Sequence, residues 1–135
     1  MTDHPAATIT FINPPELAVP PGYAHVAEVR ASRLVYVAGQ VALDRDGKLV
    51  GKGDIEAQAE QVFRNIGAAL AACGCSPRNL VKFTVFMRDV GGLAAYRKAR
   101  DRFLGDAPKP ASSLIEVSRL VSDDFLIEVE AVAAA

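Results

Sequence analysis

The stretch GDIEAQAEQVFRNIGAALAACG, residues 53–74, decides the fold because its helical period is the clearest in the chain. Its apolar residues recur at steps of three and four and form one stripe, which is the pattern of an amphipathic helix. The residues of the stripe are Ile55, Ala59, Val62, Phe63, Ile66, Leu70 and Cys73. Asp54 can cap the first turn, and Gly74 stands where a left-handed residue ends a helix.

Segments with a strand pattern lie on both sides of this helix. TITFIN (8–13) and HVAEVRA (25–31) precede it, followed by RLVYVAGQV (33–41), a nearly unbroken apolar run. Such a run predicts a strand covered on both faces. The Asp-Gly pair in DRDGK (44–48) predicts a turn after it. NLVKFTVFMRD (79–89) alternates between apolar and polar residues and therefore predicts a half-buried strand.

A second helix is predicted over about 92–104, because apolar residues repeat there with helical spacing and Gly105 follows as a stop. Residues 112–120 and 125–135 have a β pattern, and the turn VSDD (121–124) between them suggests that they pair as neighbours. The order of strands, helix, strand, helix and strands predicts an α+β fold, in which both helices pack on one face of a mixed sheet.

Length and charge limit the classes of protein and partner. The chain has 135 residues, of which 50% are hydrophobic, and we expect one domain over residues 1–135. Its 15 basic and 16 acidic residues give a net charge of -1, which supplies no field that attracts nucleic acid. The apolar runs near the N-terminus are too short for a signal peptide or a membrane span. We expect a cytoplasmic protein without a nucleic acid or membrane partner.

The cysteines predict neither a metal site nor a disulfide. Cys73 and Cys75 form a lone close pair in CGCS, and no second cluster of cysteine or histidine would complete four zinc ligands. A bridge between residues two apart would be strained. We expect reduced thiols near the end of the first helix.

Several motifs resemble those of the Rid family, also called YjgF or L-PSP endoribonucleases. They are VYVAGQVALD (35–44), the helix 53–74, VKFTVFMRD (81–89), PASSLIEVSRL (110–120) and IEVEAVA (127–133). This resemblance, which extends over nearly the whole chain, implies a chorismate-mutase-like fold and a homotrimer with ligand clefts between subunits.

The resemblance also implies hydrolysis of 2-imino or 2-enamino acids to 2-keto acids and ammonia, a reaction that needs no cofactor. In deaminating members an arginine after the Pro-Ala pair binds the substrate carboxylate with a bidentate fork. Ser112 holds that position here, Leu114 replaces a frequent cysteine, and Ala38 replaces a frequent serine. These three departures predict a less polar pocket and poor deamination of simple imino acids.

Other residues match the site of the family. Glu128 corresponds to the glutamate that orients the attacking water, and Tyr23 to a tyrosine that lines the pocket. Gly39 corresponds to a glycine that presents its backbone N–H to a ligand carboxylate. The alternative interpretations are that Glu128 is one of two solvated strand carboxylates, with Glu130, and that Gly39 only needs permissive dihedral angles.

Arg97 is a further candidate, since its place on the second helix corresponds to a polar pocket residue in relatives. It could supply the cation that Ser112 lacks. The alternative is a solvated arginine on a charged helix face.

Three classes of function remain open from the sequence. One is an imine or enamine hydrolase with an altered substrate range, and another is a trimer that binds a metabolite or a partner protein without catalysis. The endoribonuclease of the family name has the least support, because the sequence shows no basic segment with interleaved aromatic residues.

Overall fold

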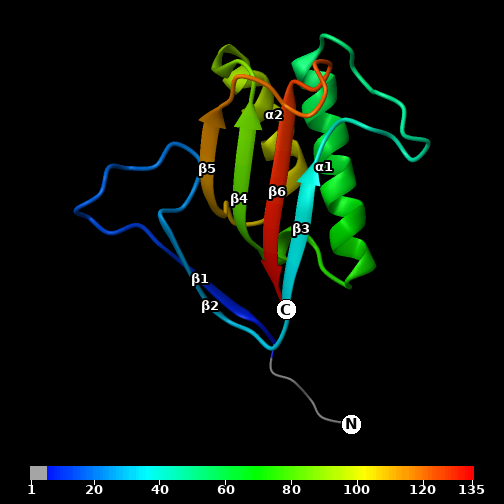
Figure 1. Cartoon of the computed structure of the whole chain (residues 1–135). Helices are drawn as coiled ribbons and strands as arrows, with labels where there is room; N and C mark the ends of the chain where they lie inside the picture. Colours follow the sequence, from blue (N-terminus) through cyan, green and yellow to red (C-terminus); the bar gives the residue numbers. More distant parts are fainter. Residues whose placement is uncertain (1–5) are drawn as a thin grey trace.

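The structure is a computed structural model that describes residues 6–135. Its two helices lie together on one face of a four-stranded sheet, with strand order β3-β6-β4-β5 (Figure 1). This arrangement confirms the predicted α+β fold. In chain order the elements are β1 (Thr8–Ile12), β2 (Val26–Arg30), β3 (Leu34–Gln40), α1 (Ile55–Ala72), η1 (Pro77–Asn79), β4 (Leu80–Met87), η2 (Val90–Gly92), α2 (Leu93–Leu104), β5 (Ala111–Glu116) and β6 (Ile127–Ala134).

Helix α1 begins and ends where its sequence predicts. The backbone N–H of Ala57 donates to Asp54 Oδ1 over 3.1 Å, which satisfies one of the free donors of the first turn. At the other end Gly74 has a φ of 70°, the left-handed conformation that glycine adopts without strain. The apolar stripe of α1 is buried against the sheet and α2, and Phe63 stacks on Phe103 with ring centroids 5.1 Å apart.

The prediction that the last two strands pair with each other is wrong. Strand β6 lies between β3 and β4 and runs antiparallel to both, whereas β5 is an edge strand parallel to β4. A parallel neighbour requires a crossover connection, which α2 provides between β4 and β5. The inward residues of β6, among them Ile127 and Val129, are fully buried, as expected for a central strand.

Strand β3 is covered on one face only, contrary to the prediction from its apolar run. Val37 faces the helices and is 7% exposed, whereas Leu34 and Tyr36 face away from them and are 58% and 75% exposed. Strands β1 and β2 form a separate antiparallel hairpin that leaves the sheet near the start of β3 (Figure 1). In the described part of the chain, the face of the sheet opposite the helices therefore carries no second layer of helices.

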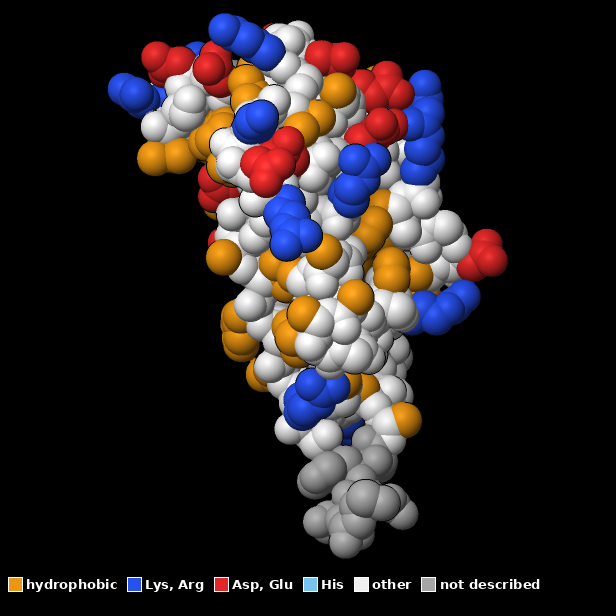
Figure 2. Space-filling model, turned by 90° about the vertical axis from the view of Figure 1, so that its right-hand side faces the viewer, with side chains coloured by type: hydrophobic (Ala, Val, Ile, Leu, Met, Phe, Trp, Pro, Cys, Tyr) orange, Lys and Arg blue, Asp and Glu red, His pale blue; other side chains and the backbone are white. Residues whose placement is uncertain are grey.

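Charged side chains of both signs are mixed on the side of the molecule formed by α1 and the loop that follows β3 (Figure 2). Neither sign forms a continuous patch on this face. Ion pairs from Lys98 and Arg102 of α2 to Glu56, and from Arg102 to Glu60, join the two helices. None of the helices within residues 6–135 is long and apolar enough to cross a lipid bilayer.

Candidate functional site

The carboxyl group of Glu128 lies against the backbone of Gly39 on the sheet face that the helices leave open. Glu128 points to this face because it alternates along β6 with the buried Ile127 and Val129. A Cβ atom at Gly39 would lie 2.8 Å from Glu128 Cδ, closer than real Cβ atoms approach another heavy atom. A side chain at position 39 would therefore displace the carboxyl group of Glu128 from its place. Its φ is not positive, so the alternative based on permissive dihedral angles is wrong.

Two side-chain amides of α1, the buried Gln58 and the half-buried Asn65, fix the chain segments that carry Gly39 and Glu128. Gln58, which is fully buried, donates to Asp124 O and accepts from the backbone N–H of Leu126, both over 2.9 Å. Asn65 donates to the carbonyl oxygens of Val41 at 3.1 Å and Leu43 at 3.0 Å. The first pair of bonds holds the chain that enters β6, and the second holds the chain that leaves β3.

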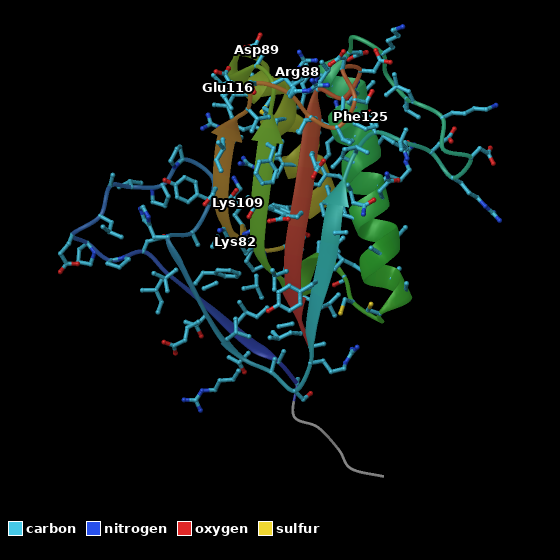
Figure 3. All side chains as sticks on the ribbon, viewed as in Figure 1. Lys82, Arg88, Asp89, Lys109, Glu116 and Phe125 are labelled. Atoms are coloured by element: carbon cyan, nitrogen blue, oxygen red, sulfur yellow. The ribbon has the colours of Figure 1, made fainter. Side chains whose placement is uncertain are left out.

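The open sheet face also has a hollow of about 420 Å³. Its side chains come from β3, β4 and β6, and Lys82, labelled in Figure 3, is its basic residue. The residues that line it are Tyr36, Val37, Ala38, Lys82, Thr84, Glu130, Ala131 and Val132. The carboxyl group of Glu130 thus lies in a hollow that also contains a cation, although no ion pair joins Glu130 to Lys82.

A separate pocket of about 160 Å³ lies between α2, the edge strand β5 and the segment before β2. Four of the candidate residues line it together: Tyr23, Arg97, Ser112 and Leu114. The segment at Tyr23 is held against the edge strand because the N–H of Ala24 donates to Pro110 O over 3.2 Å. Tyr23 also packs edge to face on His25, with ring centroids 5.5 Å apart.

The pocket and the Glu128 carboxyl group lie on opposite faces of the sheet of one chain. Ser112 is paired with Phe83, which faces the helices, whereas Glu128 is paired with Phe86, which faces away from them. Side chains of neighbouring strand residues at the same register point to the same face. The structure thus brings Glu128 together with Gly39, and Ser112 with Tyr23, Arg97 and Leu114, but it does not join these two groups within one chain.

The pocket contains two further polar groups that the sequence-based candidates omit, Tyr96 and Arg100. Arg100 is only 6% exposed, and its Nε donates to Asp101 Oδ1 over 3.0 Å. A Cβ atom on Gly22, whose φ is 110°, would lie 2.8 Å from Arg100 Nη2. The guanidinium group therefore packs directly against the backbone at Gly22. Helical spacing could have indicated this position, because Arg100 is four residues from Tyr96 and from Leu104, which are both buried.

The hydroxyl group of Tyr96 is buried, and no atom within residues 6–135 lies in hydrogen-bonding geometry with it. Burial raises the pKa of Tyr96 to about 12, against the opposing effects of the Arg100 charge and the nearby Ser112 hydroxyl. Ser112 thus lies close enough to affect the phenol without satisfying it. At neutral pH the phenol is protonated and can donate a hydrogen bond into the pocket.

No part of this arrangement resembles a metal centre. Within the described residues no three side chains of histidine, cysteine, aspartate or glutamate lie together as metal ligands would. Cys73 and Cys75 are free thiols near the end of α1, as the sequence predicts.

Fold and site together define an α+β protein with a polar pocket at its edge strand, and comparisons with known proteins identify the family. Residues 16–135 match the family model described as Endoribonuclease L-PSP. A RutC family protein of Synechocystis is 40% identical over 106 residues, which cover 78% of this chain and 81% of the relative.

Two other relatives agree with this match. The 2-iminobutanoate/2-iminopropanoate deaminase of Salmonella typhimurium is 34% identical over 111 residues, or 81% of this chain and 85% of that protein. The crystal structure of YyfB from Yersinia pestis, a Rid family protein, has a TM-score of 0.88 at 32% identity and covers 94% of this chain and 98% of its own. The chain belongs to the L-PSP family of Rid and RutC proteins.

Proposed function

We propose that this chain forms a homotrimer whose clefts between subunits bind small carboxylates and hydrolyse 2-imino or 2-enamino acids with an altered substrate range. The observation that carries the proposal is the separation of the two halves of the site. Glu128 and the pocket around Ser112 lie on opposite faces of one sheet. A cleft that contains both halves therefore requires Glu128 of one copy to face the pocket of another.

The uncovered sheet face supports self-association. Leu34 and Tyr36 expose apolar surface on β3, and Ile115 is 47% exposed on β5 of the same sheet. These side chains lie on the two edge strands of the open sheet face, and exposed apolar side chains on an uncovered face are typical of a protein interface. The apolar run of β3 is the pattern of a strand covered on both faces, and a second copy on this face would supply the missing cover.

The proposed chemistry is addition of water to a carbon–nitrogen double bond. Water attacks the imine carbon and one of its protons passes to the nitrogen, which gives a carbinolamine. The hydroxyl proton of the carbinolamine then passes to the nitrogen as the carbon–nitrogen bond breaks, and the products are a 2-keto acid and ammonia. Glu128 would accept the proton of the water and return it to the leaving nitrogen. The pocket side chains would hold the carboxylate, since positioning supplies much of the rate for such a step. The name of the Salmonella relative supports this reaction class.

The second candidate function is binding of a small metabolite without catalysis. It is favoured by Ser112, which cannot supply the bidentate fork of an arginine, and by Leu114, which adds an apolar side chain to the same pocket. Endoribonuclease activity has less support, because the charges on the α1 side are mixed rather than gathered into a basic surface (Figure 2).

Ammonia release from freshly generated 2-imino acids separates these candidates. The assay uses a series of imino acids with small, branched, aromatic and acidic side chains, with Glu128→Gln as the control for the proposed proton transfer. Release that exceeds the spontaneous rate and is lost in Glu128→Gln supports hydrolysis. Rates equal to the spontaneous rate over the whole series, with retained carboxylate binding, support the non-catalytic function. Cleavage of a labelled RNA would favour the endoribonuclease instead.

A further inference from the structure

We infer that the pocket between α2 and β5 binds one small carboxylate through the guanidinium group of Arg100 and the hydroxyl group of Tyr96. This inference deepens the proposed function. It rests on that function for one point, that the bound carboxylate is the carboxylate of the substrate. It places the cation of the site on α2 rather than on β5, and it makes Arg100 the principal anchor rather than Arg97.

The first argument is that the side chain of Arg100 is largely buried, while its hydrogen bond within residues 6–135 engages only Nε. Its side chain is 8% exposed, and its only protein acceptor within residues 6–135 is Asp101 Oδ1, which takes the Nε proton. The four N–H groups on Nη1 and Nη2 have no acceptor in that part of the chain. Among the described residues Tyr96 Oη is the fully buried side-chain atom without a partner, so the Nη groups of Arg100 still reach the pocket surface, where they can donate to a ligand.

The second argument is independent of the first and comes from the Tyr96 hydroxyl. This group is buried, lines the same pocket and also lacks a hydrogen-bond partner among the described residues. The Tyr96 ring lies beside Arg100, with the guanidinium carbon 5.8 Å from the ring centroid. Two sets of free donors thus meet at one cavity. A carboxylate satisfies both, because its two oxygens accept hydrogen bonds and donate none.

Local charge and size define the class of ligand. Arg97 and Arg100 both line the cavity. The nearby acid, Asp101, pairs with Arg100 and also lies 3.8 Å from Lys109 Nζ, so cations outnumber acids around the cavity. The cavity of about 160 Å³ equals the liquid volume of about five water molecules. This volume suits a carboxylate of about two to four carbons.

Ser112 and Gly22 explain how Arg100 fits. Serine at position 112 leaves room beside the guanidinium group, whereas an arginine there would place a further cation against Arg100 and Arg97. Glycine at position 22 lets the backbone lie flat on the guanidinium group from the other side. The exchange of a β5 arginine for serine is therefore compatible with a carboxylate site whose cation comes from α2.

Isothermal titration calorimetry at constant ionic strength tests the inference with two carboxylate probes, sodium pyruvate and sodium acetate. Acetamide, which is similar in size to acetate but uncharged, is the control probe. We expect pyruvate and acetate to bind and acetamide not to bind. Arg100→Leu should weaken pyruvate binding by about tenfold to a hundredfold, the value of a lost hydrogen bond to a charged group. Tyr96→Phe should weaken it by about two- to tenfold. Lys98→Gln, which removes a cation that pairs with Glu56 and does not line the pocket, should have no effect on pyruvate binding.

Two further variants keep the test decisive if Arg100→Leu does not fold. Arg100→Lys retains the charge but not the fork and should show intermediate affinity, and Tyr96→Phe removes only the hydroxyl group. Equal pyruvate affinities in the wild type, Arg100→Lys and Tyr96→Phe would overturn the inference, as would no pyruvate binding at all. Loss of binding in Arg97→Gln with full binding in Arg100→Lys and Tyr96→Phe would also overturn it and assign the anchor to Arg97.

The binding and ammonia-release measurements test the carboxylate anchor and the hydrolase proposal separately. If pyruvate binding depends on Arg100 and Tyr96 while no imino acid is hydrolysed, the anchor stands and the proposed hydrolase is wrong. If imino acids are hydrolysed with the same KM in the wild type, Arg100→Lys and Tyr96→Phe, the hydrolase stands and the anchor is wrong.

Discussion

The carboxyl group of Glu128 on β6 rests on the backbone of Gly39 on β3, at a distance that leaves no room for a side chain on the glycine. The two residues are 89 positions apart in the chain and meet only because β6 inserts between β3 and β4. Any change at Gly39 therefore acts on the position of Glu128.

Gly39→Ala should destabilise the protein through this contact. The new methyl group would push aside the Glu128 carboxyl group, the end of a flexible side chain, so we expect a cost of about 1 kcal/mol, at the low end of the range for overpacking. Urea unfolding of the single and double variants checks the cause, since Glu128→Ala should remove most of the cost of Gly39→Ala. The matched control is Glu130→Ala, which deletes the next outward carboxyl group of β6. If Glu130→Ala relieves Gly39→Ala as well as Glu128→Ala does, the contact is not the cause.

The exposed face of the sheet should be the surface through which copies of the chain associate. Tyr36→Glu places a charge at the aromatic residue of β3, which is 75% exposed, and should convert the proposed trimer into monomers, because burial of an unpaired carboxylate is costly. Light scattering at micromolar concentration should give three times the chain mass of 14.3 kDa for the wild type and the chain mass for the variant.

Val121→Glu is the control for assembly, since Val121 is 86% exposed in the turn before β6 and outside the sheet. It should leave the trimer intact. A wild-type mass equal to one chain would contradict both the trimer and the clefts between subunits.

The pocket should tolerate an arginine at position 112 only when Arg100 is removed. Ser112→Arg alone adds a third guanidinium group to a small cavity and should lower stability through like-charge repulsion. The double variant Ser112→Arg with Arg100→Leu has one guanidinium group fewer in the pocket than Ser112→Arg alone, so it should regain stability. It should also raise kcat/KM for small 2-imino acids about tenfold above that of Arg100→Leu.

Thermal unfolding and ammonia release measure these two effects. If the two substitutions have additive effects on both quantities, residues 100 and 112 do not share one pocket.

Stability should fall at high pH because of Tyr96. Its pKa is raised from 10.0 to about 12 by burial, so the unfolded chain ionises at a lower pH than the folded one. The contribution of the neutral phenol is fully present below pH 10 and is lost as the pH rises through 12. Its size is about 2 to 3 kcal/mol, because each pKa unit corresponds to about 1.4 kcal/mol.

Tyr96→Phe removes this titration, so the stability difference between the wild type and the variant should shift by that amount between pH 9 and pH 12. Chemical denaturation at each pH measures it. A constant difference across this range would show that Tyr96 titrates alike in the folded and unfolded states.

Local sequence patterns predicted much of the fold. Helix α1 was predicted from its apolar stripe, its aspartate cap and its terminal glycine. These are local features of a helix that buries one face against its neighbours. The alternation of β4 predicted its buried face for the same reason. The pairing of β5 with β6 was predicted wrongly. The two strands are adjacent in the chain, but β6 inserts between β3 and β4, and chain order alone does not indicate such an insertion.

The site depended more strongly on tertiary structure. Sequence alone identified Glu128, Gly39, Tyr23, Ser112, Leu114 and Arg97 as candidates, through their resemblance to family motifs. It could not assign Glu128 and Ser112 to opposite faces, because that assignment requires the register of two strands against β4. Arg100 was not among these candidates, and its burial depends on packing against Gly22 and Tyr96. Residue type determines which chemistry a side chain offers, whereas register and burial decide which groups meet and which donors remain free.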